Sequence, residues 1–228
     1  MLKELLAIFK KDSKLDEAFQ QSYEMLDITK DMFLKAKRSL RETETNELDT
    51  SIYQQDKRIN KFERLVRRDV LQHLAIAGVE GLPSGLTLVS IIIDIERIGD
   101  YTKNIVELAE NHAARLHAGS HEDDLLRVEQ AVEEAFSRVR SVLETSDSDL
   151  AEAFIKDYIW LNPLCDKRLE GYIKETDRSV SCGDAVSLAL YFRFLKRIHS
   201  HLRNVTTSVY RPFHKIGFVS KKVKNAGQ

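Results

Sequence analysis

The sequence has little of three residue types that shape irregular or cross-linked proteins. It contains two cysteines, three prolines and nine glycines among 228 residues. Cys165 and Cys182 form neither a CxxC motif nor a disulfide framework, which is typical of a reducing interior such as the cytoplasm. Few prolines and glycines, together with 31% charged residues, predict an all-α protein.

Long apolar runs are also missing. The longest, residues 86–95, is interrupted by Thr87, Ser90 and Asp94, whereas a membrane-spanning helix needs about 20 apolar residues. The apolar stretch near the N-terminus is too short for a secretory signal. We therefore expect a soluble, cytoplasmic protein without a transmembrane segment. The net charge of −1 gives no reason to expect a nucleic-acid partner.

Apolar residues recur with the helical period along most of the chain, which predicts a short amphipathic lead-in at residues 1–11 and then six long helices. The six helices are expected at roughly residues 14–43, 46–76, 86–116, 122–145, 149–177 and 184–210. Pro163 lies inside the fifth and predicts a kink or a restart there. The third begins apolar nearly all round, which indicates a central, buried helix.

The helices fall into two similar groups. Residues 1–118 are expected to form a three-helix antiparallel bundle with the lead-in attached, and residues 121–211 a second such bundle. Residues 212–228 make a basic tail without acidic residues. We interpret the tail as a solvated end, with contact to an acidic partner or peripheral association with an anionic lipid surface as the alternative.

Two pairs of matching stretches indicate that the two groups arose by internal duplication. Residues 96–104 read ERIGDYTKN and are echoed by residues 196–204, KRIHSHLRN. Residues 56–60 read DKRIN and are echoed by residues 166–170, DKRLE. Because the matches keep the same order, the chain is expected to be two copies of one unit.

The first copy carries two rows of oxygen-bearing side chains, because residues three or four apart lie on the same side of a helix. The rows lie on the second and third helices and comprise Asp56, Asn60, Glu63, Glu96, Asp100 and Asn104. Both rows continue core-side apolar stripes, where uncompensated acids are unfavourable. A positive charge is therefore expected between them, either a metal ion or a salt bridge to Arg58 or Arg97.

Carboxylate and amide oxygens without cysteine or matched histidine favour Mg²⁺, Mn²⁺, Ca²⁺ or iron, with zinc as a further candidate. The Glu-x-x-His pairs of ferritin-like di-iron proteins are absent from the sequence. His199 and His201 stand two apart, so they are expected to face different directions, partly exposed. Gly99, inside a helix, is expected to allow a neighbouring helix to come close.

The second copy keeps only part of the acidic set. Its degenerate site comprises Asp166, Glu170, Lys196, Ser200 and Asn204, with Lys196 and Ser200 in place of two acids. If the copies superpose, the Lys196 ammonium should point at Asp166 and Glu170. It would then occupy the place where the first copy needs a metal.

The stretch DIERIGDYTKNI at residues 94–105 resembles the signature helix of the PhoU family of phosphate-uptake regulators. Tyr101 stands where that family commonly has histidine, and residues 56–60 are similar to its second acidic motif. The resemblance implies two tandem three-helix bundles and cytosolic, non-catalytic regulation of phosphate transport. It also implies metal ions on the acidic patches, association with a phosphate transporter component and a sensor kinase, and homodimers.

Two other functions remain open at this point. The first is a metal-free helical adaptor, serving another transporter, in which Arg58 and Arg97 neutralise the acids. The second is a helical-bundle metalloenzyme, against which the missing histidine ligands weigh.

Overall fold

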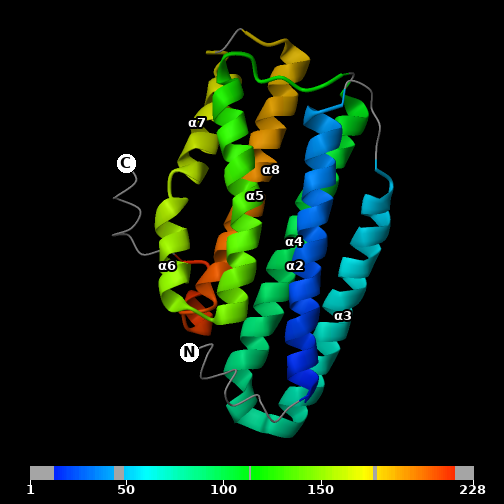
Figure 1. The fold of residues 1–228 in the computed structure, drawn as a ribbon, viewed down its shortest axis with the longest axis vertical. Helices are drawn as coiled ribbons and strands as arrows, with labels where there is room; N and C mark the ends of the chain where they lie inside the picture. The colour runs from blue at the N-terminus through cyan, green and yellow to red at the C-terminus, as the bar shows by residue number, and fades with distance from the viewer. Residues whose placement is uncertain (1–12, 44–48, 113, 177–178, 219–228) are drawn as a thin grey trace.

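The computed structural model describes residues 13–43, 49–112, 114–176 and 179–218, and the described part is helical without strands (Figure 1). The long helices are α2 (Ser13–Arg41), α3 (Ser51–Ala77), α4 (Leu82–Asn111), α5 (Glu122–Thr145), α6 (Ser148–Asp157), α7 (Leu161–Ile173) and α8 (Cys182–Thr207). Short 3₁₀ turns are η1 (Gly78–Gly81), η2 (Gly119–His121) and η3 (Phe213–Lys215). The predicted all-α class is confirmed. The lead-in at residues 1–11 and most of the basic tail lie outside the described residues.

The first three helices form an antiparallel group. Along α2 and α3, the Lys35 Nζ lies 3.0 Å from the Ser51 hydroxyl, and the Arg58 guanidinium lies 2.6 Å from Glu24. The later residue of α2 contacts the earlier residue of α3, so the two helices are antiparallel. Helices α3 and α4 are joined by the single turn η1, so they form a hairpin at one end of the molecule (Figure 1).

The predicted fifth helix is two helices. Residues 149–177 were expected as one element, but α6 ends at Asp157 and α7 begins at Leu161. Pro163 is the third residue of α7, where its missing N–H has no intrahelical partner to lose. The predicted restart at Pro163 is therefore confirmed, and the continuous helix is wrong.

Helices α4 and α8 lie side by side at the centre and join the two groups of helices (Figure 1). Most of the inward positions of both are fully buried, including Ile95 on α4 and Leu195 on α8. Burying each such side chain stabilises the fold by roughly 1.5–3 kcal/mol. The buried apolar residues of both groups belong to one continuous cluster. The division into two separate units therefore stays a prediction.

A buried ionic network also joins the two groups at the end opposite the α3–α4 turn. The Arg41 Nε of α2 donates to Glu129 of α5 over 2.9 Å, and the Tyr191 hydroxyl of α8 donates to the same carboxylate oxygen over 2.8 Å. Arg41 also pairs with Glu122. Arg41, Glu129 and Tyr191 are each at most 3% exposed, so removing Arg41 would leave the Glu129 carboxylate buried without its ion-pair partner.

One region meets the length and composition of a membrane span. A window within residues 51–111 has a mean hydropathy of 1.7, with 39% of it buried in the structure. A helix in the core of a bundle passes the same test, and α4 lies at the centre of this one. The expected lack of a transmembrane segment therefore stays a prediction.

Candidate functional site

The two acidic rows are brought together by the close packing of α3 on α4. A methyl group added at Gly99 would lie 3.3 Å from the Ile59 side chain of α3 and 3.8 Å from that of Thr29 on α2. The distance to Thr29 is an ordinary contact, whereas the Ile59 side chain would have to shift by a few tenths of an ångström. Gly99 thus lies at a close contact between α4 and α3, as the sequence predicted.

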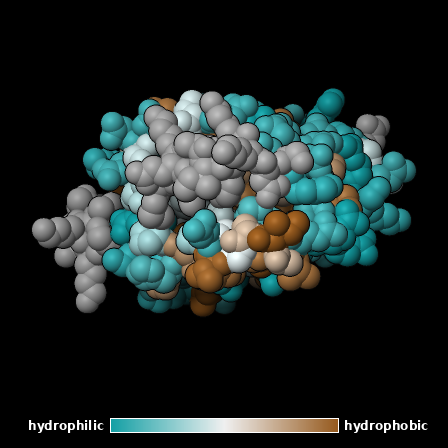
Figure 2. Space-filling view, turned by 90° about the horizontal axis from the view of Figure 1, so that it is seen from below, coloured by the Kyte–Doolittle hydropathy of each residue, from teal (hydrophilic) through white to brown (hydrophobic). Residues whose placement is uncertain are grey.

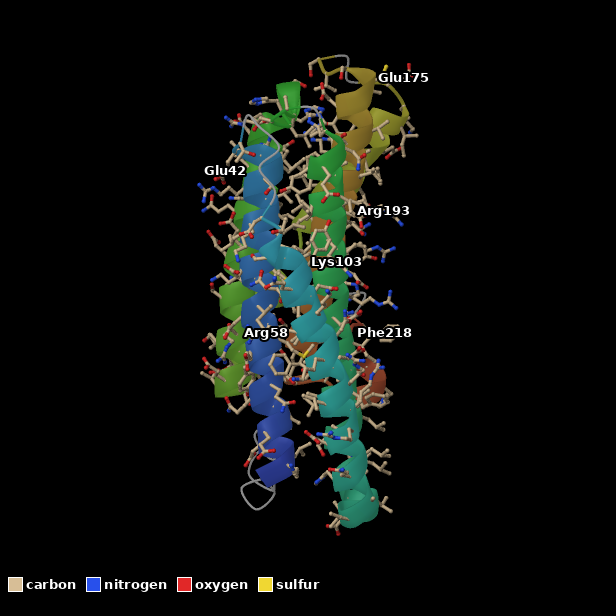
Figure 3. All side chains as sticks on the ribbon, turned by 90° about the vertical axis from the view of Figure 1, so that its right-hand side faces the viewer. Glu42, Arg58, Lys103, Glu175, Arg193 and Phe218 are labelled. Atoms are coloured by element: carbon tan, nitrogen blue, oxygen red, sulfur yellow. The ribbon has the colours of Figure 1, made fainter. Side chains whose placement is uncertain are left out.

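Lys103 lies between the rows. Its Nζ is 3.0 Å from Asp56 Oδ1 on α3 and 3.1 Å from Asp100 Oδ1 on its own helix. Burial alone would lower the pKa of Lys103, but the two carboxylates outweigh it and raise that pKa above its usual value. Figure 3 shows Lys103 midway along this face. A lysine ammonium therefore already supplies positive charge between the acidic helices.

An open cleft surrounds this ion triad. Its volume is about 490 Å³, and it is lined by Tyr53, Asp56, Arg97, Asp100, Tyr101, Lys103, Asn104 and Glu107. The structure thus brings three of the predicted metal ligands, Asp56, Asp100 and Asn104, into one cleft. Within the described chain, no group of three or more acidic, histidine or cysteine side chains has the arrangement of a metal site.

The other three predicted ligands have different surroundings. The Asn60 side-chain amide donates to Asp56 Oδ2 over 3.2 Å, and Glu63 forms an ion pair of 2.6 Å with Arg67. Glu96 is the least compensated acid, since its nearest cation, Arg97, is 3.9 Å away. Both Asn60 and Glu63 are therefore held by neighbours on their own helix.

The surroundings of Glu96 disfavour its ionised form. Its pKa is raised, first because the carboxyl is partly buried and then because Asp100 and Glu63 are close enough to repel its charge. Arg97 and Lys103 oppose the shift without cancelling it. Glu96 thus lies in the negative field of Asp100 and Glu63.

The arginines expected to neutralise the acids do so poorly. Arg58 pairs with Glu24 of α2, away from both rows (Figure 3), so that prediction is wrong. Arg97 remains beside Glu96 at 3.9 Å. Sequence reasoning overlooked Lys103, although its position three residues after Asp100 placed it within reach of that carboxylate. Its contact with Asp56 depended on the packing of α3.

The degenerate site in the second group is only partly assembled. Lys196 Nζ lies 2.5 Å from Asp166 Oδ1, as expected, but Glu170 pairs with Lys174 instead. The Ser200 hydroxyl accepts a hydrogen bond of 3.0 Å from Asn162. The expectation that Lys196 would serve both acids is therefore wrong for Glu170.

Asn204, the last residue of the degenerate set, belongs to the contact between α4 and α8. Its amide donates to Asp94 Oδ1 over 3.1 Å, and His201 Nδ1 lies 2.6 Å from the same oxygen. The Tyr101 ring stacks on His201 with centroids 5.7 Å apart. The echoed asparagine thus helps to join the two copies instead of completing a second site.

His199 and His201 face different directions, as predicted, but His199 is not exposed. It is 2% exposed, stacks with the Phe154 ring, and its Nδ1 lies 3.0 Å from Asn162 Oδ1. Burial, with the nearby Arg203 charge, lowers the pKa of His199 to about 3. His199 occupies the helix position that Gly99 has in the first copy. That position carries a buried aromatic ring in the second copy and a glycine beside α3 in the first.

Comparison with known proteins matches the region that carries the acidic rows. The family model described as "PhoU domain" matches residues 22–109. The solved structure of PhoU from Pseudomonas aeruginosa is similar, with a TM-score of 0.72 and 20% sequence identity, covering 87% of this chain and 96% of that chain. No curated protein matches significantly. The predicted resemblance to the PhoU family is thus confirmed over residues 22–109, and the likeness to the solved structure extends the fold to nearly the whole chain.

Proposed function

We propose that this protein is a PhoU-like, non-catalytic regulator of phosphate transport or signalling. The match of residues 22–109 to the PhoU domain and the PhoU-like fold support this proposal. Its place in the cytoplasm, its homodimer and its docking on a transporter component or a sensor kinase are parts of the same proposal. A regulator of this kind has no transition state to stabilise, so its output would be a surface that a partner recognises.

The observation that carries the proposal is the Lys103 ammonium between Asp56 and Asp100. One ammonium faces two acids directly, and Glu96 adds a third acid that it does not contact. The acidic face therefore keeps excess negative charge, which favours a further cation. We propose a metal ion there, one of Fe, Zn, Mn, Mg or Ca, with ligands drawn from Asp56, Asn60, Glu63, Glu96, Asp100 and Asn104.

The donor set fits a hard cation, since carboxylates and amides are its preferred ligands. When bound, such an ion would supply positive charge at the face and hold carboxylates of two helices. The residues of this chain would then change partners. The Lys103 ammonium, 3.0 Å from Asp56 and 3.1 Å from Asp100, would be repelled by an added cation, so Lys103 would turn toward solvent and the charge pattern of the face would change.

A second candidate function is a metal-free adaptor, which the same lysine favours. Lys103 already compensates Asp56 and Asp100, as Lys196 compensates Asp166 in the second copy. In this view, the acidic face docks a basic partner directly. Chelator treatment would then leave partner binding unchanged.

The experiment is elemental analysis and Mn²⁺ titration of the full chain beside the double variant Glu96→Gln, Asp100→Asn. We expect bound metal in the wild type and its loss in the variant. The matched control is Asp166→Asn, Glu170→Gln, which removes two acids from the degenerate face and should keep the metal. No metal in any of the three proteins would overturn the metal proposal and favour the adaptor.

Phosphate regulation itself is tested in cells that depend on this chain. Deleting the gene should change phosphate uptake or the expression of phosphate-starvation genes, and the wild-type chain should restore it. Unchanged phosphate handling after deletion would contradict the proposed function, whatever the metal content.

A further inference from the structure

The end of the α3–α4 hairpin exposes apolar side chains. Ile76 is 88% exposed and Val79 is 78% exposed, the two highest values among the large hydrophobic residues described, and Leu82 is 40% exposed. We name these three residues the apolar tip. Figure 2 views the molecule from this end and shows apolar side chains gathered there. Adjacent exposed apolar residues on a polar molecule are typical of an interaction surface.

The register between α2 and α3 explains why the described part of α2 does not cover the tip. Contacts join Lys35 to Ser51 and Glu24 to Arg58, so the first described residue of α2 lies level with roughly residues 69–73 of α3 at 1.5 Å per residue. Helix α3 continues to Ala77, and η1 follows. The apolar tip therefore extends beyond the start of α2, on a part of the hairpin that the described part of α2 does not reach.

The chain that precedes α2 has the right length, position and pattern to cover the tip. Residues 1–12 lead into α2 at the same end of the molecule as the tip. Leu2, Leu5, Leu6 and Phe9 follow the spacing of one helix face. A helix of 11 residues is about 16 Å long, enough to cross the ends of two packed helices that lie about 10 Å apart.

We propose that residues 1–11 dock on the apolar tip through the face formed by Leu2, Leu5, Leu6 and Phe9. Attachment through Asp12 gives this segment a high effective concentration at the tip, which a separate partner would lack. Lys3, Lys10 and Lys11 lie off the apolar face and remain in water. Docking would bury Ile76 and Val79, which otherwise favour self-association.

The test places an environment-sensitive fluorophore beside the tip without altering it. Glu80→Cys, in the turn η1, carries the label in a Cys182→Ser background, and Cys165 stays unlabelled because it is buried. We expect the label to be shielded from a soluble quencher in dilute full-length protein. The double change Leu5→Asp, Leu6→Asp should abolish that shielding. The matched control is a label at Glu170→Cys on α7, near the opposite end, whose quenching should not respond.

Each other outcome would overturn the proposal. Equal quenching at Glu80→Cys with and without Leu5→Asp, Leu6→Asp would show that residues 1–11 do not cover the tip. Shielding that disappears on dilution would assign the tip to a second copy of the chain. Shielding that arises only with anionic lipid vesicles would assign it to a membrane surface. Unchanged circular dichroism of the double variant checks that the bundle itself remains folded.

Discussion

The first and second copies both compensate acidic side chains with a lysine, but the two lysines occupy different helix positions. In the first copy, Lys103 follows Asp100 by three residues on α4 and reaches Asp56 across to α3. In the second copy, Lys196 occupies the position of Glu96 and pairs with Asp166. Each half therefore places an ammonium beside the aspartate that the two copies share, Asp56 or Asp166. The first half also keeps two further acids, Glu96 and Asp100.

The two copies differ in how far their acids are compensated. In the second copy, the lysine replaces an acid, so Asp166 and Lys196 balance each other. In the first copy, the lysine is added to a complete acidic set, and Glu96 stays poorly compensated with a raised pKa. A site that retains unfavourable charge at a helix interface is a candidate functional site.

The largest expected effect comes from breaking the contact between the copies. Glu129→Ala removes the buried carboxylate partner of Arg41, which keeps only the more exposed Glu122, and leaves the Tyr191 hydroxyl without an acceptor. We expect a loss of about 3–5 kcal/mol in the free energy of unfolding. Chemical denaturation measures it. The control, Glu133→Ala, removes a half-exposed partner of Lys37 and should cost about 1 kcal/mol or less. Equal losses would contradict the buried network.

The next effect distinguishes His199 from its counterpart Gly99. The unfolded pKa of histidine is about 6.5, whereas that of folded His199 is about 3. Between these values the unfolded state binds more protons, so stability falls as pH falls below 6.5. At pH 5 this costs roughly 2 kcal/mol.

Replacing His199 tests that pH dependence. The loss of stability between pH 7 and pH 5 should be smaller in His199→Leu than in wild type by about 2 kcal/mol. The exposed His214 supplies the control, since His214→Gln should follow the wild-type pH profile. Parallel profiles for His199→Leu and wild type would show that His199 is not buried in its neutral form.

A smaller effect compares the two lysines. Lys103→Gln removes contacts to two carboxylates on two helices and should cost about 1 kcal/mol of stability. Lys196→Gln removes one pair whose aspartate is largely exposed, so its cost should be about 0.5 kcal/mol or less. Denaturation in 0.1 and 1 M salt measures both, and screening should reduce both losses. A larger loss for Lys196→Gln would reverse the comparison.

The sequence predicted the elements that depend on local pattern. The helical period placed α2 within two residues of its ends, at roughly residues 14–43 against Ser13–Arg41. Gly99 predicted a close helix crossing, and the motif on α4 predicted the PhoU likeness. These features follow from residue spacing on one helix, which the sequence contains directly.

The features that the sequence did not predict depend on how helices pack. Lys103 reaches Asp56 only because α3 and α4 cross at Gly99, and Asn204 bonds Asp94 only because α4 lies against α8. Pro163 predicted the break between α6 and α7. No residue near Asp157 predicted that α6 ends there. The six proposed metal ligands share a face, but whether they bind metal stays a prediction.

The central claim is that Lys103 competes with a cation for the first acidic face. Mn²⁺ titration of wild type, Lys103→Gln and Lys196→Gln, with the bound ion detected by electron paramagnetic resonance, tests it most directly. Removing a unit charge beside the ion should tighten Mn²⁺ binding by about tenfold or more in Lys103→Gln. Lys196→Gln should bind as wild type does. Equal Mn²⁺ affinity in wild type and Lys103→Gln would contradict the account.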